Sequence, residues 1–109
     1  MPDNKNKNLF GLTVNEIERI YSIFQKYSSV RFVKIFGSRA TENYKNSSDI
    51  DFAIINSGVS LREILAIKSD FAESDLPYFV DILDVNTLTN DNLINQIKYY
   101  GKQFYSKSK

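Results

Sequence analysis

A glycine-serine pair and two closely spaced aspartates are the residues of this chain whose types and spacing best suit a chemical reaction. Gly37-Ser38 follows the apolar stretch 30–36, and Asp49 and Asp51 open a second apolar stretch. A glycine turn after a strand can offer backbone N–H groups to an anion. Paired carboxylates attract a hard cation such as Mg²⁺. The spacing therefore predicts a phosphate-binding turn beside a divalent-metal site.

The alternation of side chains along a strand places Asp49 and Asp51 on one face, with their Cα atoms about 6.6 Å apart. Ile50, Phe52 and Ile54 then face the other way, where they can pack against helices. The repulsion between the two carboxylates calls for a cation. A pair of this kind taken alone is more often a solvated acidic edge, so the metal-site interpretation depends on the rest of the chain.

Asp81 is the candidate for a third carboxylate. It interrupts the apolar run 78–83, where a buried carboxylate without a partner would be costly. Asp84 is its rival, and because the two are three positions apart, they face opposite sides of a regular strand. Val80 and Ile82 resemble the core-facing set of the preceding strand. We therefore expect Asp81 to join the aspartate pair and Asp84 to lie in a turn at the strand end.

The glycine turn also has a plainer interpretation, because a Gly-Ser after a strand is often only turn and cap chemistry. The chain lacks the second glycine and the Lys-Ser/Thr pair of a Walker loop, and it lacks the three-glycine dinucleotide fingerprint. Arg39 directly follows the turn and is a candidate contact for phosphate oxygens.

Composition removes several other chemistries. The 109 residues include no cysteine and no histidine, which excludes disulfides, zinc sites built on thiolate or imidazole, and Ser-His-Asp triads. A net charge of +1 gives no strong field for nucleic acid. The apolar runs are too short to span a membrane and the amino terminus is polar, so we expect a cytoplasmic protein without membrane contact.

The elements that must position the candidate residues follow from capping motifs and periodicity. Capping boxes at Thr13 and Ser60 predict two helices, Asn90 caps a third, and a helical turn follows Ser38. Strands are predicted over 30–36, 49–55 and 78–83, with a short edge strand at 103–105. Residues 1–109 then form one α+β domain, a mixed β-sheet with helices packed mainly on one face, in which 1–9 and 106–109 are flexible.

The candidate residues resemble the signature of the polymerase-β-type nucleotidyltransferase superfamily. Similarity to its minimal nucleotidyltransferase (MNT) branch extends over roughly residues 12–105 and implies the fold of that superfamily. Many relatives have Arg and Gly where this chain has Thr41 and Glu42. The matching segments are Gly37-Ser38-Arg39-Ala40, Ser48-Asp49-Ile50-Asp51-Phe52-Ala53-Ile54, Asp81 and Gly101-Lys102-Gln103-Phe104-Tyr105.

Members of the MNT branch are typically antitoxins paired with a HEPN-domain toxin, and several transfer AMP from ATP to a tyrosine of the toxin. The resemblance implies that Asp49 and Asp51 hold two Mg²⁺ ions. It also implies that Asp81 completes the metal site and helps to deprotonate the attacking hydroxyl. ATP and a HEPN-family toxin are then the implied substrate and partner.

The same resemblance implies that Gly37 and Ser38 cradle the β- and γ-phosphates, with Arg39 as a further phosphate contact. Two other functions stay open. The domain could neutralise its partner by contact alone, with the acidic residues as a relic, or it could be a stand-alone nucleotidyltransferase for a small molecule or an RNA end. Homo-oligomerisation is also left open. The small size favours an acceptor that is presented by a partner protein.

Overall fold

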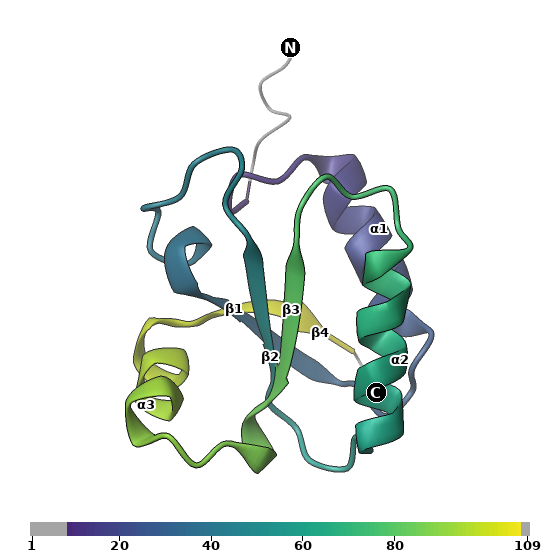
Figure 1. Ribbon diagram of the computed structural model, residues 1–109, viewed down its shortest axis with the longest axis vertical. Coiled ribbons are helices and arrows are strands. Elements are labelled where there is room, and N and C mark those ends of the chain that lie inside the picture. The colour runs from purple at the N-terminus through teal and green to yellow at the C-terminus, as the bar shows by residue number, and fades with distance from the viewer. Residues whose placement is uncertain (1–8, 108–109) are drawn as a thin grey trace.

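A computed structural model describes residues 9–107 of the chain (Figure 1). All the predicted helices and strands are present, with small differences at the strand ends. In chain order the elements are α1 (Val14–Gln25), β1 (Phe32–Phe36), the 3-10 turn η2 (Gly37–Arg39), β2 (Ile50–Ile54), α2 (Leu61–Ala72), β3 (Val80–Asp84), the 3-10 turn η3 (Val85–Thr87), α3 (Asp91–Tyr100) and β4 (Lys102–Ser106).

The helices begin where the capping motifs predict. The Thr13 hydroxyl accepts a hydrogen bond from the Glu16 backbone N–H, and the Glu16 carboxylate accepts one from the Thr13 N–H. Ser60 forms the same capping box at the start of α2, and the Asn90 side chain caps α3. These side chains satisfy N–H groups that have no partner within the helix, which fixes where each helix starts.

The sheet has the strand order β3-β2-β1-β4. β1 runs antiparallel to β2 and to β4, whereas β2 and β3 are parallel and are joined by the α2 crossover. The register sets Asp51 of β2 opposite Phe36 at the end of β1 and opposite Asp81 of β3. Residues that are far apart in the sequence therefore meet at one end of the three strands.

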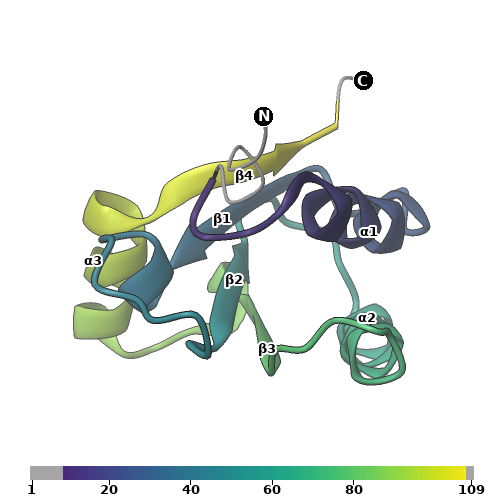
Figure 2. The same cartoon turned by 90° about the horizontal axis from the view of Figure 1, so that it is seen from above.

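Helices cover the two faces of the sheet unequally. α1 and α2 lie on one side and α3 on the other (Figure 2). The main core lies under α1 and α2 and includes Phe52 and Ile82, while a smaller cluster under α3 contains Phe36, Ala53 and Ile97. The prediction of a mixed sheet with helices mainly on one face is confirmed, and α3 is the helix on the opposite face.

The carboxyl end is more ordered than predicted. Ser106 is the last residue of β4, and the Lys107 N–H donates to the Arg31 carbonyl at 2.9 Å, so the prediction of a flexible segment from 106 is wrong for these two residues. The predicted flexible residues 1–8 and 108–109 lie outside the described part of the chain. Between residues 9 and 107, none of the helices has the length and apolar character that crossing a membrane requires.

Candidate active site

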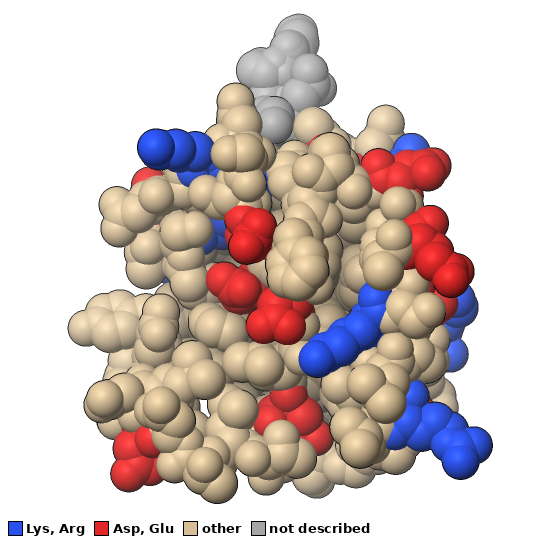
Figure 3. Space-filling view, viewed as in Figure 1, with Lys and Arg blue, Asp and Glu red and all other residues tan. Residues whose placement is uncertain are grey.

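Three aspartates meet on the sheet face that α1 and α2 leave uncovered. Asp49 directly precedes β2, Asp51 lies within it, and Asp81 is its register partner in β3. Phe52 and Ile82, the next residues along the two strands, point into the main core. Figure 3 shows acidic side chains gathered at the middle of the molecule, over β2 and β3. Strand alternation thus keeps the carboxylates outside while it buries their apolar neighbours.

Asp84 lies apart from the other three aspartates, as strand parity predicts. It is the last residue of β3, and its carboxylate accepts a hydrogen bond of 3.0 Å from the Asn86 backbone N–H at the start of η3. This is ordinary turn-capping chemistry. The structure therefore brings Asp81, and not Asp84, to the aspartate pair.

The carboxylate of Asp51 feels the charges of its two acidic neighbours. Partial burial, followed by the charges of Asp81 and of Asp49, raises the pKa of Asp51 above its ordinary value. Each of these causes disfavours the ionised form, because the carboxylate loses water and gains negative neighbours. The folded protein therefore concentrates negative charge at a point where a cation would relieve it.

The aspartates offer the right ligand atoms for a magnesium site, although they do not form a closed one. Over residues 9–107, no three acidic side chains are arranged to hold an ion as they stand. Asp49 is exposed, and Asp51 and Asp81 are only half-buried, so all three carboxylates are accessible from outside the core. Carboxylate oxygens are the ligands that Mg²⁺ prefers. The chemistry of the donor set therefore fits this ion.

The glycine turn lies directly against the central carboxylate. Gly37 follows β1 with a φ of 79°, in the left-handed region that favours glycine. A β-carbon at this position would lie 2.6 Å from Oδ2 of Asp51. Ser38 is half-buried in the same turn, and its carbonyl accepts from the backbone N–H groups of Thr41 and Asn43. The turn and the metal-binding candidates therefore form one continuous site.

Arg39 has a structural role, which corrects the expectation that it contacts phosphate. Its side chain is only 1% exposed. Nε and Nη2 donate to the Ser48 carbonyl at 3.1 and 2.9 Å, and Nη2 also donates to the Asn46 carbonyl at 3.2 Å. Nη1 donates to the Phe10 carbonyl at 2.8 Å. The guanidinium is thus committed to backbone oxygens and is not presented to a nucleotide.

Two tyrosine rings complete the surroundings of Arg39. Its guanidinium carbon lies 5.3 Å from the ring centre of Tyr44 and 4.7 Å from that of Tyr78, within the range of cation–π attraction. Tyr78 leads into β3, and Ser48 is the residue before Asp49. Arg39 therefore ties the loop that ends at Asp49 to the segment that leads to Asp81.

Glu42 has a backbone conformation that favours glycine. Its φ is 65°, in the left-handed region where an L side chain costs about 1–2 kcal/mol. The glycine that many MNT-branch sequences carry at this place fits the conformation without that cost. The presence of Glu42 in place of glycine therefore strains the backbone locally, in an exposed loop.

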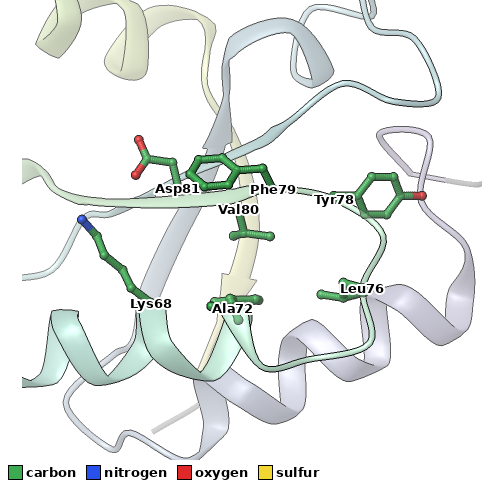
Figure 4. Close-up of a pocket in the computed structure, with 8 residues that line it drawn as sticks. Lys68, Ala72, Leu76, Tyr78, Phe79, Val80 and Asp81 are labelled. Atoms are coloured by element: carbon green, nitrogen blue, oxygen red, sulfur yellow. The ribbon is translucent and has the colours of Figure 1, made fainter.

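A groove adjoins the aspartates on the side away from Gly37. It has a volume of about 460 Å³ and runs between α2 and β3, with Asp81 in its lining (Figure 4). Sequence reasoning did not find that Lys68 and Phe79 line a groove, because no local pattern marks them. Its lining residues are Lys68, Phe71, Ala72, Leu76, Tyr78, Phe79, Val80 and Asp81.

Comparison with known proteins agrees with this geometry. The family described as "Polymerase beta, Nucleotidyltransferase" matches residues 18–109. A relative from Haemophilus influenzae, named "Probable protein adenylyltransferase MntA", is 38% identical over 79 residues, which are 70% of this chain and 68% of the relative.

Solved structures share the fold. A crystal structure of a toxin-antitoxin with AMP-PNP aligns with a TM-score of 0.67 and 22% identity, over 84% of this chain and 73% of that chain. The MNT antitoxin complex with a tri-AMPylated Shewanella oneidensis HEPN toxin aligns with a TM-score of 0.61 and 20% identity, over 84% and 70% of the two chains. At these identities the likeness concerns the fold.

Proposed function

This chain belongs to the polymerase-β nucleotidyltransferase family, and on that premise we propose that it is a Mg²⁺-dependent adenylyltransferase acting as an antitoxin. It transfers AMP from ATP to a tyrosine hydroxyl of a HEPN-family toxin. The observation that carries the proposal is the placement of Asp51 between Gly37 and Asp81. A phosphate-binding turn, a cation-attracting carboxylate and a candidate base follow one another across three neighbouring strands.

The reaction is an in-line displacement at phosphorus. The hydroxyl oxygen of the acceptor forms a bond to the α-phosphorus of ATP, the bond from that phosphorus to the oxygen bridging to the β-phosphate breaks, and pyrophosphate leaves. The hydroxyl proton passes to a carboxylate, for which Asp81 is the candidate because β2 separates its strand, β3, from β1, which leads into the phosphate turn. Gly37 and Ser38 hold the β- and γ-phosphates, which keeps the leaving group aligned.

The carboxylates of Asp49, Asp51 and Asp81 are the residues that would hold Mg²⁺. When bound, the ion supplies positive charge to the triphosphate and to the charge that develops during displacement. Arg39 fixes the backbone of Ser48, the residue before Asp49, by donating to its carbonyl. Its contribution to the reaction is made through that loop.

The partner is proposed from the relatives. The similar Haemophilus influenzae protein is named for protein adenylyltransferase activity, and a fold neighbour is an antitoxin bound to an AMPylated HEPN toxin. Neutralisation by contact alone would not need a carboxylate, that of Asp51, whose ionised form is disfavoured by partial burial and by two neighbouring aspartates. That energetic cost favours the catalytic proposal over the contact-only one.

The test is transfer of AMP from α-labelled ATP to the HEPN-family protein that co-purifies with this chain. Wild type and Asp84→Asn are expected to label the partner in a Mg²⁺-dependent way, because Asp84 caps a turn outside the aspartate set. The Asp49→Asn/Asp51→Asn double variant is expected to label it at least about a hundredfold more slowly. Equal labelling by the double variant, or full inhibition of the toxin without ATP and Mg²⁺, would contradict the proposal.

A further inference from the structure

We propose that the groove between α2 and β3 is the acceptor site, which receives a tyrosine carried on a segment of the partner polypeptide. The inference rests on the proposed function, because it assigns a place to the acceptor of that reaction. Three observations carry it: the position of the groove relative to Gly37, the chemistry of its lining, and the free edge of β3.

The first observation concerns the direction of attack. In an in-line displacement, the attacking oxygen and the leaving group lie on opposite sides of the phosphorus. Gly37 touches Asp51, Asp51 is paired with Asp81, and the groove lies beyond Asp81. With pyrophosphate at the Gly37 turn, the attacking hydroxyl has to arrive from the side of the groove.

The second observation is that the groove is apolar along most of its wall and polar at one end. Its wall on the α2 side of β3 is apolar and includes Phe71, Leu76 and Val80, and Lys68 reaches from α2 toward the end of the groove at which Asp81 lies, across β3 from Val80 (Figure 4). This arrangement suits a phenol, whose ring is apolar and whose hydroxyl is polar. The hydroxyl would lie toward Asp81, which accepts its proton. The Lys68 ammonium at the same end favours the negative charge that develops on the oxygen.

The third observation is that β3 has one free edge. Among residues 9–107 it is the outermost strand of the sheet and pairs only with β2. Phe79, which directly precedes β3, is 69% exposed and lines the groove. An extended segment can lie along such an edge through its backbone while one of its side chains enters the neighbouring groove. Phe79 then supplies an exposed aromatic contact for the partner, of the kind that dominates binding energy in interfaces.

The kinetic test compares Phe79→Ala and Lys68→Ala with matched controls that lie outside the groove. Phe32→Ala removes another exposed phenylalanine, and Arg62→Ala removes another exposed cation of α2. Phe79→Ala is expected to raise KM for the HEPN-family partner by about tenfold, with KM for ATP within about twofold of wild type. Lys68→Ala is expected to lower kcat/KM for the partner, and both controls are expected to stay close to wild type.

Two kinetic outcomes would overturn the assignment. An unchanged KM for the partner in Phe79→Ala would remove the groove from the acceptor path. A rise in KM for ATP, with KM for the partner unchanged, would instead assign the groove to the nucleotide.

A binding measurement separates this inference from the proposed function. The affinity of the co-purifying HEPN-family protein is measured by calorimetry without ATP or Mg²⁺. Phe79→Ala is expected to weaken it by about tenfold, and Phe32→Ala is expected to leave it unchanged. If wild type binds the partner but transfers no AMP, the proposed function fails. The affinities of wild type and Phe79→Ala would still show whether the groove binds the partner. Equal affinities of wild type and Phe79→Ala would overturn the groove as a docking surface.

Discussion

The carboxylate of Asp51 lies against the α-carbon of Gly37, at the junction of two strands. Because a β-carbon at residue 37 would meet Oδ2 of Asp51 at 2.6 Å, any larger residue has to displace the carboxylate. Gly37 thus meets two demands at once, a left-handed backbone and close approach by a charged side chain. The geometry of the metal-binding candidates is therefore sensitive to a change in the neighbouring turn.

Gly37→Ala is expected to reduce the free energy of unfolding by about 2–3 kcal/mol and to lower AMP transfer strongly. Gly58→Ala is the control, because Gly58 also has a positive φ, 95°, but has open space where the β-carbon would lie. It is expected to lose only about 1 kcal/mol and to keep its activity. For both variants, urea denaturation measures the loss of stability and the transfer assay measures the loss of activity. Equal losses for the two variants would contradict the close approach.

Asp51→Asn is expected to abolish AMP transfer while it stabilises the protein in the absence of divalent ions. The amide keeps the shape of the side chain and removes a charge that burial and two other aspartates disfavour. The variant is expected to be more stable than wild type near pH 7, an example of stability gained at the expense of activity. Thermal unfolding in EDTA measures it. Asp75→Asn, at an exposed site, is the control and is expected to leave the melting temperature unchanged.

The pH dependence of stability follows from the same carboxyl group. The pKa of Asp51 is raised in the folded state above its ordinary value of 3.8, so its contribution favours folding at low pH and is lost as pH rises through the folded pKa. The stability difference between Asp51→Asn and wild type is therefore expected to be small near pH 4 and to grow toward pH 7. Addition of Mg²⁺ is expected to diminish it. If the stability difference shrank with rising pH, the pKa of Asp51 would be lowered, not raised, in the folded state.

Arg39→Lys is expected to destabilise the protein by about 1–3 kcal/mol, because one ammonium cannot replace the guanidinium contacts to three backbone carbonyls. Arg31→Lys changes an exposed arginine and serves as the control. Chemical denaturation measures the loss. If Arg39 contacted phosphate instead, the variant would keep its stability and show a raised KM for ATP.

Local pattern and strand parity sufficed to predict where the carboxylates lie. Asp51 and Asp81 sit in strands whose alternate residues are apolar, so burial of Ile82 and Phe52 determines on which face each aspartate emerges. The same reasoning separated Asp84 from the set. Capping boxes marked the helix starts because their contacts lie within four residues of one another.

The role of Arg39 and the groove were beyond such reasoning, because both depend on contacts between distant segments. Arg39 reaches the Phe10 carbonyl and the ring of Tyr78, neither of which a local pattern relates to it. The groove exists because α2 packs beside the outermost strand of the sheet, so its lining combines a helix with the segment around Phe79. Polarity alone could not tell whether Arg39 is exposed to a ligand or buried among carbonyls.

The register of β2 and β3 has a consequence for how this protein can lose its activity. A slip of one residue would turn Asp81 into the apolar core and bring Val80 or Ile82 to the surface, a state that the burial cost of a carboxylate makes unfavourable. The chain therefore has no misaligned form of the sheet that is close in energy to the native one. Destabilising changes in the core should reduce the number of working molecules rather than the rate of each one, so that activity and folded fraction decline together.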